Sequence, residues 1–185
     1  MRHAFHADLA EALARRRIGT FRYNFPYTEA GRRRPDRTSV LTSTVRSAVQ
    51  AAAEEAGGLP LLGGGKSMGG RMTSTAASET PLPGVRGLVF FGFPLHRPGE
   101  TSTARAEHLD RVTVPLLFLQ GARDRLADIS LIQIVCRKLR GRVTLHVVED
   151  ADHSFHLPRR TGRSAADVSD ELAGAVETWT EGLGL

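Results

Sequence analysis

The chain has 185 residues, of which 41% are hydrophobic and 24% are charged, and its formal net charge at pH 7 is +5. These values are typical of a folded globular protein, and the length suits a single domain covering residues 1–185. They exclude a disordered chain, and no stretch approaches the roughly 20 apolar residues of a membrane-spanning helix.

The charged residues and the single cysteine indicate which partners and which cellular compartment to expect. Lys66 and Lys138 are the only lysines beside many arginines, and no aromatic side chains alternate with the arginines as in a single-strand-binding surface. The N-terminus lacks the apolar stretch of a signal peptide, and Cys136 lies among apolar residues at helical spacing, as a core thiol would. We therefore expect a cytoplasmic protein with no nucleic-acid or membrane partner, no metal and no cofactor; its oligomeric state stays open.

Strand and helix patterns alternate along the chain. Helices are expected at about 3–17, 41–56, 67–78, 103–110 and 128–140 and after Ser164, which forms a capping box with Asp167. Strands are expected at Thr20 to Phe25, 60–64, 87–91, 115–120 and 143–148. This repetition predicts an α/β fold: a mainly parallel sheet of about five strands, helices on both faces in three layers, and no lid domain.

One pentapeptide carries the strongest chemical signal. Gly65-Lys66-Ser67-Met68-Gly69 follows a short apolar run and precedes a helix pattern, which is the arrangement of a nucleophile elbow, G-x-S-x-G. The serine then stands at the apex of a strained turn, and the glycines on either side are expected to let the strand and helix backbones approach. The backbone N–H of Met68 would point at a developing oxyanion.

The same residues have two other interpretations. Ser67 suits the N-cap of the following helix, a common position for serine. Gly65-Lys66-Ser67 also matches the end of a phosphate-binding loop, but Pro60 stands where that motif needs its first glycine, and proline has no N–H to donate.

Candidate partners of Ser67 follow later strands. Asp124 comes after the strand at 115–120, and His153 comes after the strand at 143–148. This order predicts a triad in which Ser67 attacks an acyl carbon, His153 takes and returns the proton, and Asp124 orients the imidazole. Asp128 is the rival acid, at an expected helix start, and His156 is too close to His153 to exclude.

Further polar residues after strand ends are candidates for substrate binding: Asn24, Tyr27, Arg33 within Arg32 to Arg34, and His96. One interpretation is an acyl pocket with a positively charged wall that suits an anionic ester or lactone. The other is a solvated arginine loop, with His96 on the surface. The other histidines fit less well, since His3 and His6 lie on an expected helix and His146 inside a strand.

The chain resembles the small, capless α/β-hydrolase-like proteins of the testis-expressed-protein-30 type, distant relatives of the dienelactone hydrolases. The matching stretches lie between the start of the chain and about residue 156: Arg22-Tyr23-Asn24-Phe25-Pro26-Tyr27, Arg34-Pro35-Asp36, Gly64 to Arg71, Pro94-Leu95-His96, Leu117 to Gly121 with Asp124, and Asp152-His153-Ser154-Phe155. The resemblance implies a hydrolase fold with the triad of Ser67, Asp124 and His153, and it implies much less about the substrate. We expect a serine hydrolase acting on a carboxylic ester, thioester or lactone. Dienelactone hydrolases carry cysteine where this chain has Ser67, which favours ordinary ester chemistry. The alternative is an inactive hydrolase-fold protein that binds or scaffolds.

The chain departs from that family at its start. Members have an earlier strand that ends in a His-Gly-Ala-Gly-like loop, and this loop donates the second oxyanion N–H. In the family's sheet that strand lies between the strand matching Thr20 to Phe25 and the elbow strand. Either the true start lies upstream of Met1, which we favour, or the sheet closes differently with half an oxyanion hole. The 185-residue form is therefore expected to be poorly active and to associate through the gap.

Overall fold

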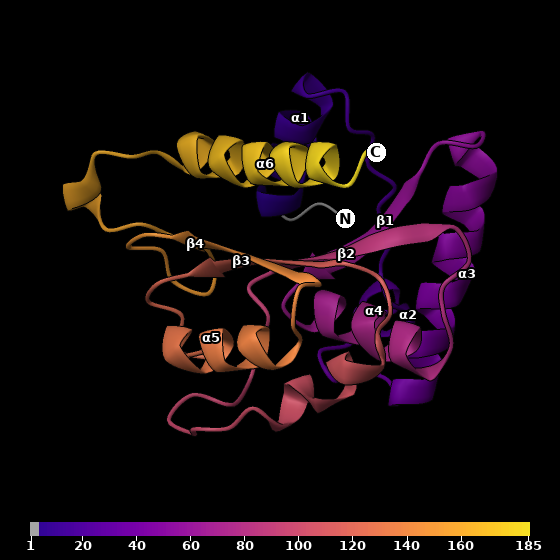
Figure 1. Cartoon of the computed structure of the whole chain (residues 1–185), viewed down its shortest axis with the longest axis horizontal. Coiled ribbons are helices and arrows are strands. Elements are labelled where there is room, and N and C mark those ends of the chain that lie inside the picture. Colours follow the sequence, from indigo (N-terminus) through magenta and orange to yellow (C-terminus); the bar gives the residue numbers. More distant parts are fainter. Residues whose placement is uncertain (1–3) are drawn as a thin grey trace.

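The computed structural model describes residues 4–185 and has a parallel four-stranded sheet, in the order β1-β2-β3-β4, at its centre (Figure 1). The strands are β1 (Leu61–Lys66), β2 (Val85–Phe91), β3 (Leu116–Gly121) and β4 (Val143–Val148). The helices are α1 (Ala4–Arg15), α2 (Pro26–Glu29), α3 (Thr38–Ala56), α4 (Met68–Glu79), α5 (Ile129–Lys138) and α6 (Ala165–Gly182), with 3-10 turns η1 (Ala104–Arg111) and η2 (Arg159–Thr161). The α/β class is confirmed; residue 3 of the first expected helix lies outside the described residues.

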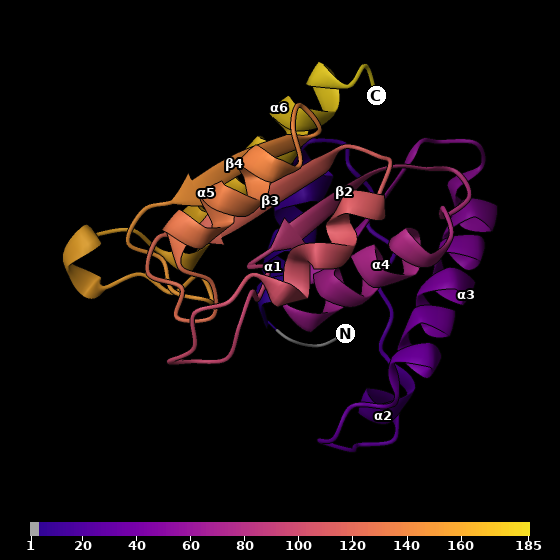
Figure 2. The ribbon, with the colours of Figure 1, turned by 60° about the horizontal axis from the view of Figure 1, so that its bottom comes forward.

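Two helical layers cover the sheet. Helices α1 and α6 lie on one face, and α4 and α5 lie on the other with α3 beside α4 (Figures 1 and 2). Successive strand residues alternate between the layers: Leu88 and Phe90 join the core under α4, whereas Val89 and Phe91 join the core under α1 and α6. Both faces of the central strands are therefore buried, as expected for a parallel sheet. Within the described residues, no helix is long and apolar enough to cross a membrane.

Helix α6 is seated closely on the sheet. Ser164 and Asp167 form the expected capping box at its start, and Trp179 near its end is buried. A Cβ added to Gly87 of β2 would lie 2.6 Å from Cη2 of Trp179. The indole therefore occupies the space that any larger residue at position 87 would need.

The fifth expected strand is absent from residues 4–185, and that prediction was wrong. Thr20 to Phe25 has no regular secondary structure. Phe25 packs into the core and the Arg22 guanidinium donates to the carbonyl of His6, so the segment is held by side chains rather than by a strand ladder. β1 pairs only with β2, and Thr20 to Phe25 does not extend the sheet at its free edge. The carbonyl of Phe25 instead accepts from the N–H groups of Thr28 and Glu29 at the start of α2.

Cys136 on α5 is only half-buried, although it packs against the core as expected. Burial raises the pKa of its thiol to about 11. The thiol is therefore protonated at neutral pH and is a poor nucleophile.

The half-buried side chain of His108 joins η1 to α4. Nε2 of His108 lies 2.8 Å from Oγ of Ser74, a residue with no exposed surface. Burial, with the charges of Arg111 and Arg71, lowers the pKa of His108 from 6.5 to about 4. The folded protein therefore holds this imidazole neutral at a pH where the unfolded chain protonates it.

This difference predicts a loss of stability in weak acid. A histidine with a depressed pKa leaves stability intact above about pH 6.5 and lowers it as the pH falls toward 4, because the unfolded state then binds more protons. We expect the melting temperature to fall between pH 7 and pH 5, and to fall less in His108→Gln. Equal falls in both proteins would show that His108 does not contribute to the pH dependence.

Candidate active site

Ser67 stands alone between β1 and α4 in a strained backbone conformation. Its φ is 51° and its ψ is −116°, values that residues with a side chain rarely adopt. Its N–H donates to the carbonyl of Phe91 at 3.0 Å, and its carbonyl accepts from the N–H of Arg71 at 3.2 Å. The hydroxyl makes no capping hydrogen bond to α4. The local geometry is therefore that of an elbow and not of a serine N-cap.

The glycines that permit this turn are partly different from those expected. A Cβ at Gly65 would lie 3.0 Å from the carbonyl carbon of Gly69, and a Cβ at Gly70 would lie 2.7 Å from the carbonyl oxygen of Gly65. A Cβ at Gly69 would meet nothing within 4 Å. Gly65 therefore lets the strand and helix approach, as predicted. The second glycine needed for this approach is Gly70 and not Gly69, because a Cβ on Gly70 would project from α4 toward β1.

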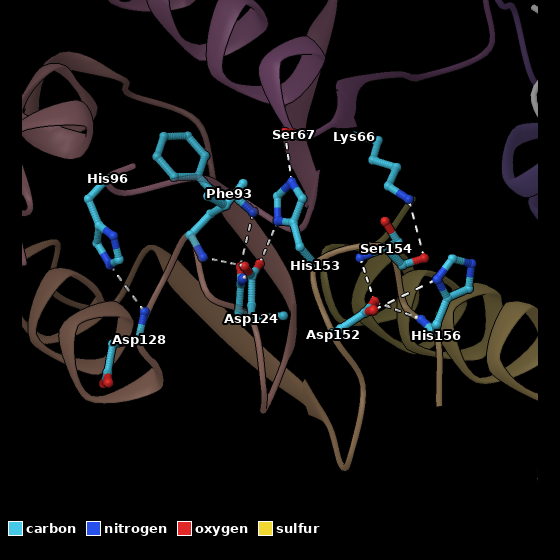
Figure 3. A network of polar contacts seen from close by, with 12 residues as sticks. Lys66, Ser67, Phe93, His96, Asp124, Asp128, Asp152, His153, Ser154 and His156 are labelled. Atoms are coloured by element: carbon cyan, nitrogen blue, oxygen red, sulfur yellow. Dashed lines mark hydrogen bonds and ion pairs between the residues drawn. The ribbon is translucent and has the colours of Figure 1, made fainter. Parts of the chain in front are cut away.

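The structure brings Ser67, His153 and Asp124 together at the carboxyl edge of the sheet (Figure 3). Nε2 of His153 lies 2.9 Å from Oγ of Ser67, and Nδ1 lies 2.7 Å from Oδ2 of Asp124. Because an ionised carboxylate only accepts, Nδ1–H donates to Asp124 and Nε2 is left to accept from the serine hydroxyl. In this tautomer the lone pair of Nε2 faces Oγ of Ser67.

Besides His153, two further groups donate to the carboxylate of Asp124. Its side chain has no exposed surface. The N–H of Leu126 donates to Oδ1 at 2.7 Å, and Nε2 of Gln120 donates to Oδ2 at 2.5 Å. The side-chain oxygen Oε1 of Gln120 accepts in turn from the N–H of Phe93 at 3.0 Å. Sequence reasoning missed Gln120; its signal was a single amide at the end of an apolar strand.

The rival residues are directed elsewhere. Asp128 caps α5, accepting from the N–H of Ser130 at 2.8 Å, and its hydrogen bonds with Ser130 lower the pKa of its carboxyl. The side chain of His156 is 80% exposed and lies 3.7 Å from Asp152. The structure therefore places Asp124 and His153, rather than Asp128 and His156, beside Ser67.

Two more glycines bring the histidine loop to the sheet. Gly92 has a φ of 70°, and a Cβ there would lie 3.4 Å from Nδ1 of His153. A Cβ at Gly121 would lie 2.5 Å from the carbonyl of Ala151. These close approaches, which the sequence pattern did not reveal, set the imidazole against the ends of β2 and β3.

A cavity of about 630 Å³ opens beside Ser67 and His153, along the free edge of β1. The segment at 18–28 lines its far side, including the predicted binding residues Asn24 and Tyr27. Asn24 donates to Glu29 at 2.6 Å, which fixes its amide. Arg33 is exposed and is not among the lining residues; Arg22 and Lys66 supply the positive charge there.

His96 lies outside that lining, and it is buried rather than on the surface. Nδ1 lies 2.8 Å from the carbonyl of Arg97, and Nε2 accepts from the N–H of Asp128 at 3.5 Å. Its ring connects the loop after β2 to the start of α5 (Figure 3). His3 lies outside the described residues, while His146 contacts Glu171 at 2.8 Å.

Met68 begins α4, so its N–H precedes the first intrahelical hydrogen bonds and lies directly after Ser67. It is the residue that the sequence predicts as an oxyanion donor. Among residues 4–185, no group of three His, Cys, Asp or Glu side chains is placed to hold a metal ion.

A strained serine between strand and helix, with a histidine at the carboxyl edge of a parallel sheet, defines the α/β serine-hydrolase type of fold. A family model described as "Alpha/beta hydrolase domain" matches residues 1–181, and the chain belongs to this family.

Solved structures agree with this fold. An α/β serine hydrolase homologue from Coxiella burnetii is similar with a TM-score of 0.72 at 19% identity, covering 94% of this chain and 76% of the other. A serine hydrolase without a lid from Xanthomonas campestris has a TM-score of 0.72 at 20% identity, with 97% and 75% covered. An esterase domain from Rhodothermus marinus has a TM-score of 0.69 at 15% identity, with 97% and 81% covered. At these identities the similarity shows the fold alone.

The glycine contacts predict opposite results at neighbouring positions. Gly70→Ala forces a Cβ against the Gly65 carbonyl, and we expect a loss of about 1–3 kcal/mol in the free energy of unfolding. Gly69→Ala, in open space on the same helix, should leave stability unchanged or raise it by up to about 1 kcal/mol. Urea unfolding measures both; a less stable Gly69→Ala with an unaffected Gly70→Ala would contradict this packing.

Proposed function

We propose that the protein is a serine hydrolase that cleaves a small carboxylic ester, thioester or lactone through an acyl-enzyme. The observation that carries this proposal is the 2.9 Å contact between Oγ of Ser67 and Nε2 of His153 at the strained elbow. A serine hydroxyl is a weak nucleophile until a base accepts its proton, and this geometry supplies the base.

In the proposed reaction, Oγ of Ser67 attacks the acyl carbon while Nε2 of His153 takes its proton. The resulting imidazolium is stabilised by Asp124, which accepts from Nδ1. The N–H of Met68 donates to the oxyanion. Collapse of the tetrahedral intermediate breaks the bond to the leaving group, which receives the proton from His153. A water molecule, activated by the same imidazole, then hydrolyses the acyl-serine.

We place the substrate in the cavity between β1 and the segment at 18–28. Leu62, Phe91 and Tyr27 contribute apolar surface, and Arg22 and Lys66 contribute positive charge. This combination suits an acyl group with an anionic end. Nucleic acids and membranes are not proposed as partners, and we assign the protein to the cytoplasm.

We also propose a subgroup for this chain within the α/β-hydrolase family. The stretches around Asn24, Ser67 and His153 favour the testis-expressed-protein-30 type within the family, with the dienelactone hydrolases as distant relatives. The second candidate function is that of a hydrolase-fold protein of low activity that binds or scaffolds, because the fold by itself does not require catalysis.

Labelling with a fluorophosphonate probe separates the two candidates. We expect the wild type to be labelled at Ser67, Ser67→Ala to lose the label, and His153→Ala to react about 10⁴-fold more slowly or worse, because its base is gone. Ser74→Ala is the matched control, since Ser74 also lies beside a histidine but is fully buried. An unlabelled wild type would favour the scaffold, and label retained in Ser67→Ala would exclude Ser67 as nucleophile.

The preference for an anionic acyl group is tested at Arg22, which lines the cavity. Arg22→Gln should raise KM for mono-para-nitrophenyl succinate by about twofold to fivefold, as expected for an exposed charge pair worth up to about 1 kcal/mol. KM for para-nitrophenyl butyrate should not change. Arg33→Gln, outside the cavity, is the control and should affect neither ester. An equal effect of Arg22→Gln on both esters would exclude recognition of the carboxylate.

A further inference from the structure

Lys66 links the two halves of the candidate site. It is the last residue of β1, directly before Ser67, and its Nζ donates to the carbonyl of Ser154 at 3.3 Å. Ser154 directly follows His153. A single side chain thus joins the residue before the candidate nucleophile to the residue after the candidate base (Figure 3).

The surroundings of the ammonium hold it in place. Nζ lies 4.1 Å from the ring centroid of Phe5 and 5.8 Å from that of Phe155, and these two rings are stacked on each other at 5.6 Å. Burial lowers the pKa of Lys66, while the charges of Asp152 and Asp124 oppose that shift. A partly buried cation over aromatic faces interacts with them more strongly than an exposed one. Lys66 is therefore a fixed group and not a solvated side chain.

The loop that Lys66 holds is tight and strained. Asp152 accepts at Oδ1 from the N–H of Ser154 at 2.7 Å and from that of His156 at 2.9 Å. Phe155 has a φ of 64°, which is unfavourable for a residue with a Cβ, and its side chain is buried. A strained segment keeps one conformation only when its surroundings fix it, and the Lys66 ammonium is one of those constraints.

We propose that Lys66 is a positioning residue, which holds the loop at 152–156 so that His153 reaches Ser67. The predicted change in turnover rests on the proposed function, whereas the predicted position of the loop does not. Direct binding of a substrate anion by Lys66 is the competing role, since the same side chain lines the cavity.

Two substitutions at this position isolate the charge. Lys66→Met keeps an unbranched stem and removes the donor, whereas Lys66→Arg keeps a cation that can donate to the carbonyl and stack on the rings. Lys138→Met, at the exposed end of α5, removes the only other lysine and serves as the control. The readouts are the melting temperature and kcat and KM for two esters, the neutral para-nitrophenyl butyrate and the anionic mono-para-nitrophenyl succinate.

We expect Lys66→Met to lower kcat about 10- to 100-fold, as a misplaced base does, with KM and melting temperature little changed. Lys66→Arg should recover most of the loss, and Lys138→Met should match the wild type. An unchanged kcat in Lys66→Met would overturn the inference. So would a parallel loss of activity and melting temperature that arginine does not restore, or an effect confined to KM for mono-para-nitrophenyl succinate.

Crystal structures of the wild type and both Lys66 variants separate this inference from the proposed function. If the wild type neither reacts with the fluorophosphonate nor turns over the ester, the proposed function fails, but the loop position is still measurable. Displacement of His153 beyond hydrogen-bond distance from Ser67 in Lys66→Met, restored in Lys66→Arg, supports the inference. An unmoved loop in Lys66→Met overturns it.

Discussion

The left-handed backbone of Ser67 depends on the contact between β1 and α4, and the rest of the site depends on that backbone. Such a conformation costs about 1–3 kcal/mol in a residue with a side chain. The cost is offset by backbone hydrogen bonds to Phe91 and Arg71 and by the packing of Gly65 against Gly70. This backbone conformation directs the hydroxyl of Ser67 away from the sheet, to a position where His153 contacts it.

Those residues are fixed by a network that leaves the buried carboxylate of Asp124 satisfied. Gln120, Leu126 and His153 each donate to it, and Gln120 is itself anchored by the N–H of Phe93. A buried charge without such partners would be costly, so the network orients the imidazole and stabilises the fold together. The candidate site is therefore preorganised: the network holds the loop that carries His153 against the ends of the strands.

The sequence pattern predicted the features that depend on neighbouring residues in the chain. The alternation of strands and helices and the order Ser67, Asp124, His153 were readable because each residue follows its own apolar run. The strand at Thr20 to Phe25 was not, because a strand exists only with a neighbour, and a single sequence does not show which neighbour is present. Gly70 and Gln120 escaped notice for a related reason: their roles depend on the angle between α4 and β1 and on a loop distant in sequence.

The position of Trp179 over Gly87 also gives the protein two distinct optical reporters. Trp179 is the only tryptophan and lies in the core between the sheet and α6, whereas the two tyrosines, Tyr23 and Tyr27, pack against the core on the opposite face. Tryptophan and tyrosine emission therefore sense different sides of the same sheet. The unlabelled chain can thus report which helical layer detaches first when the protein is heated.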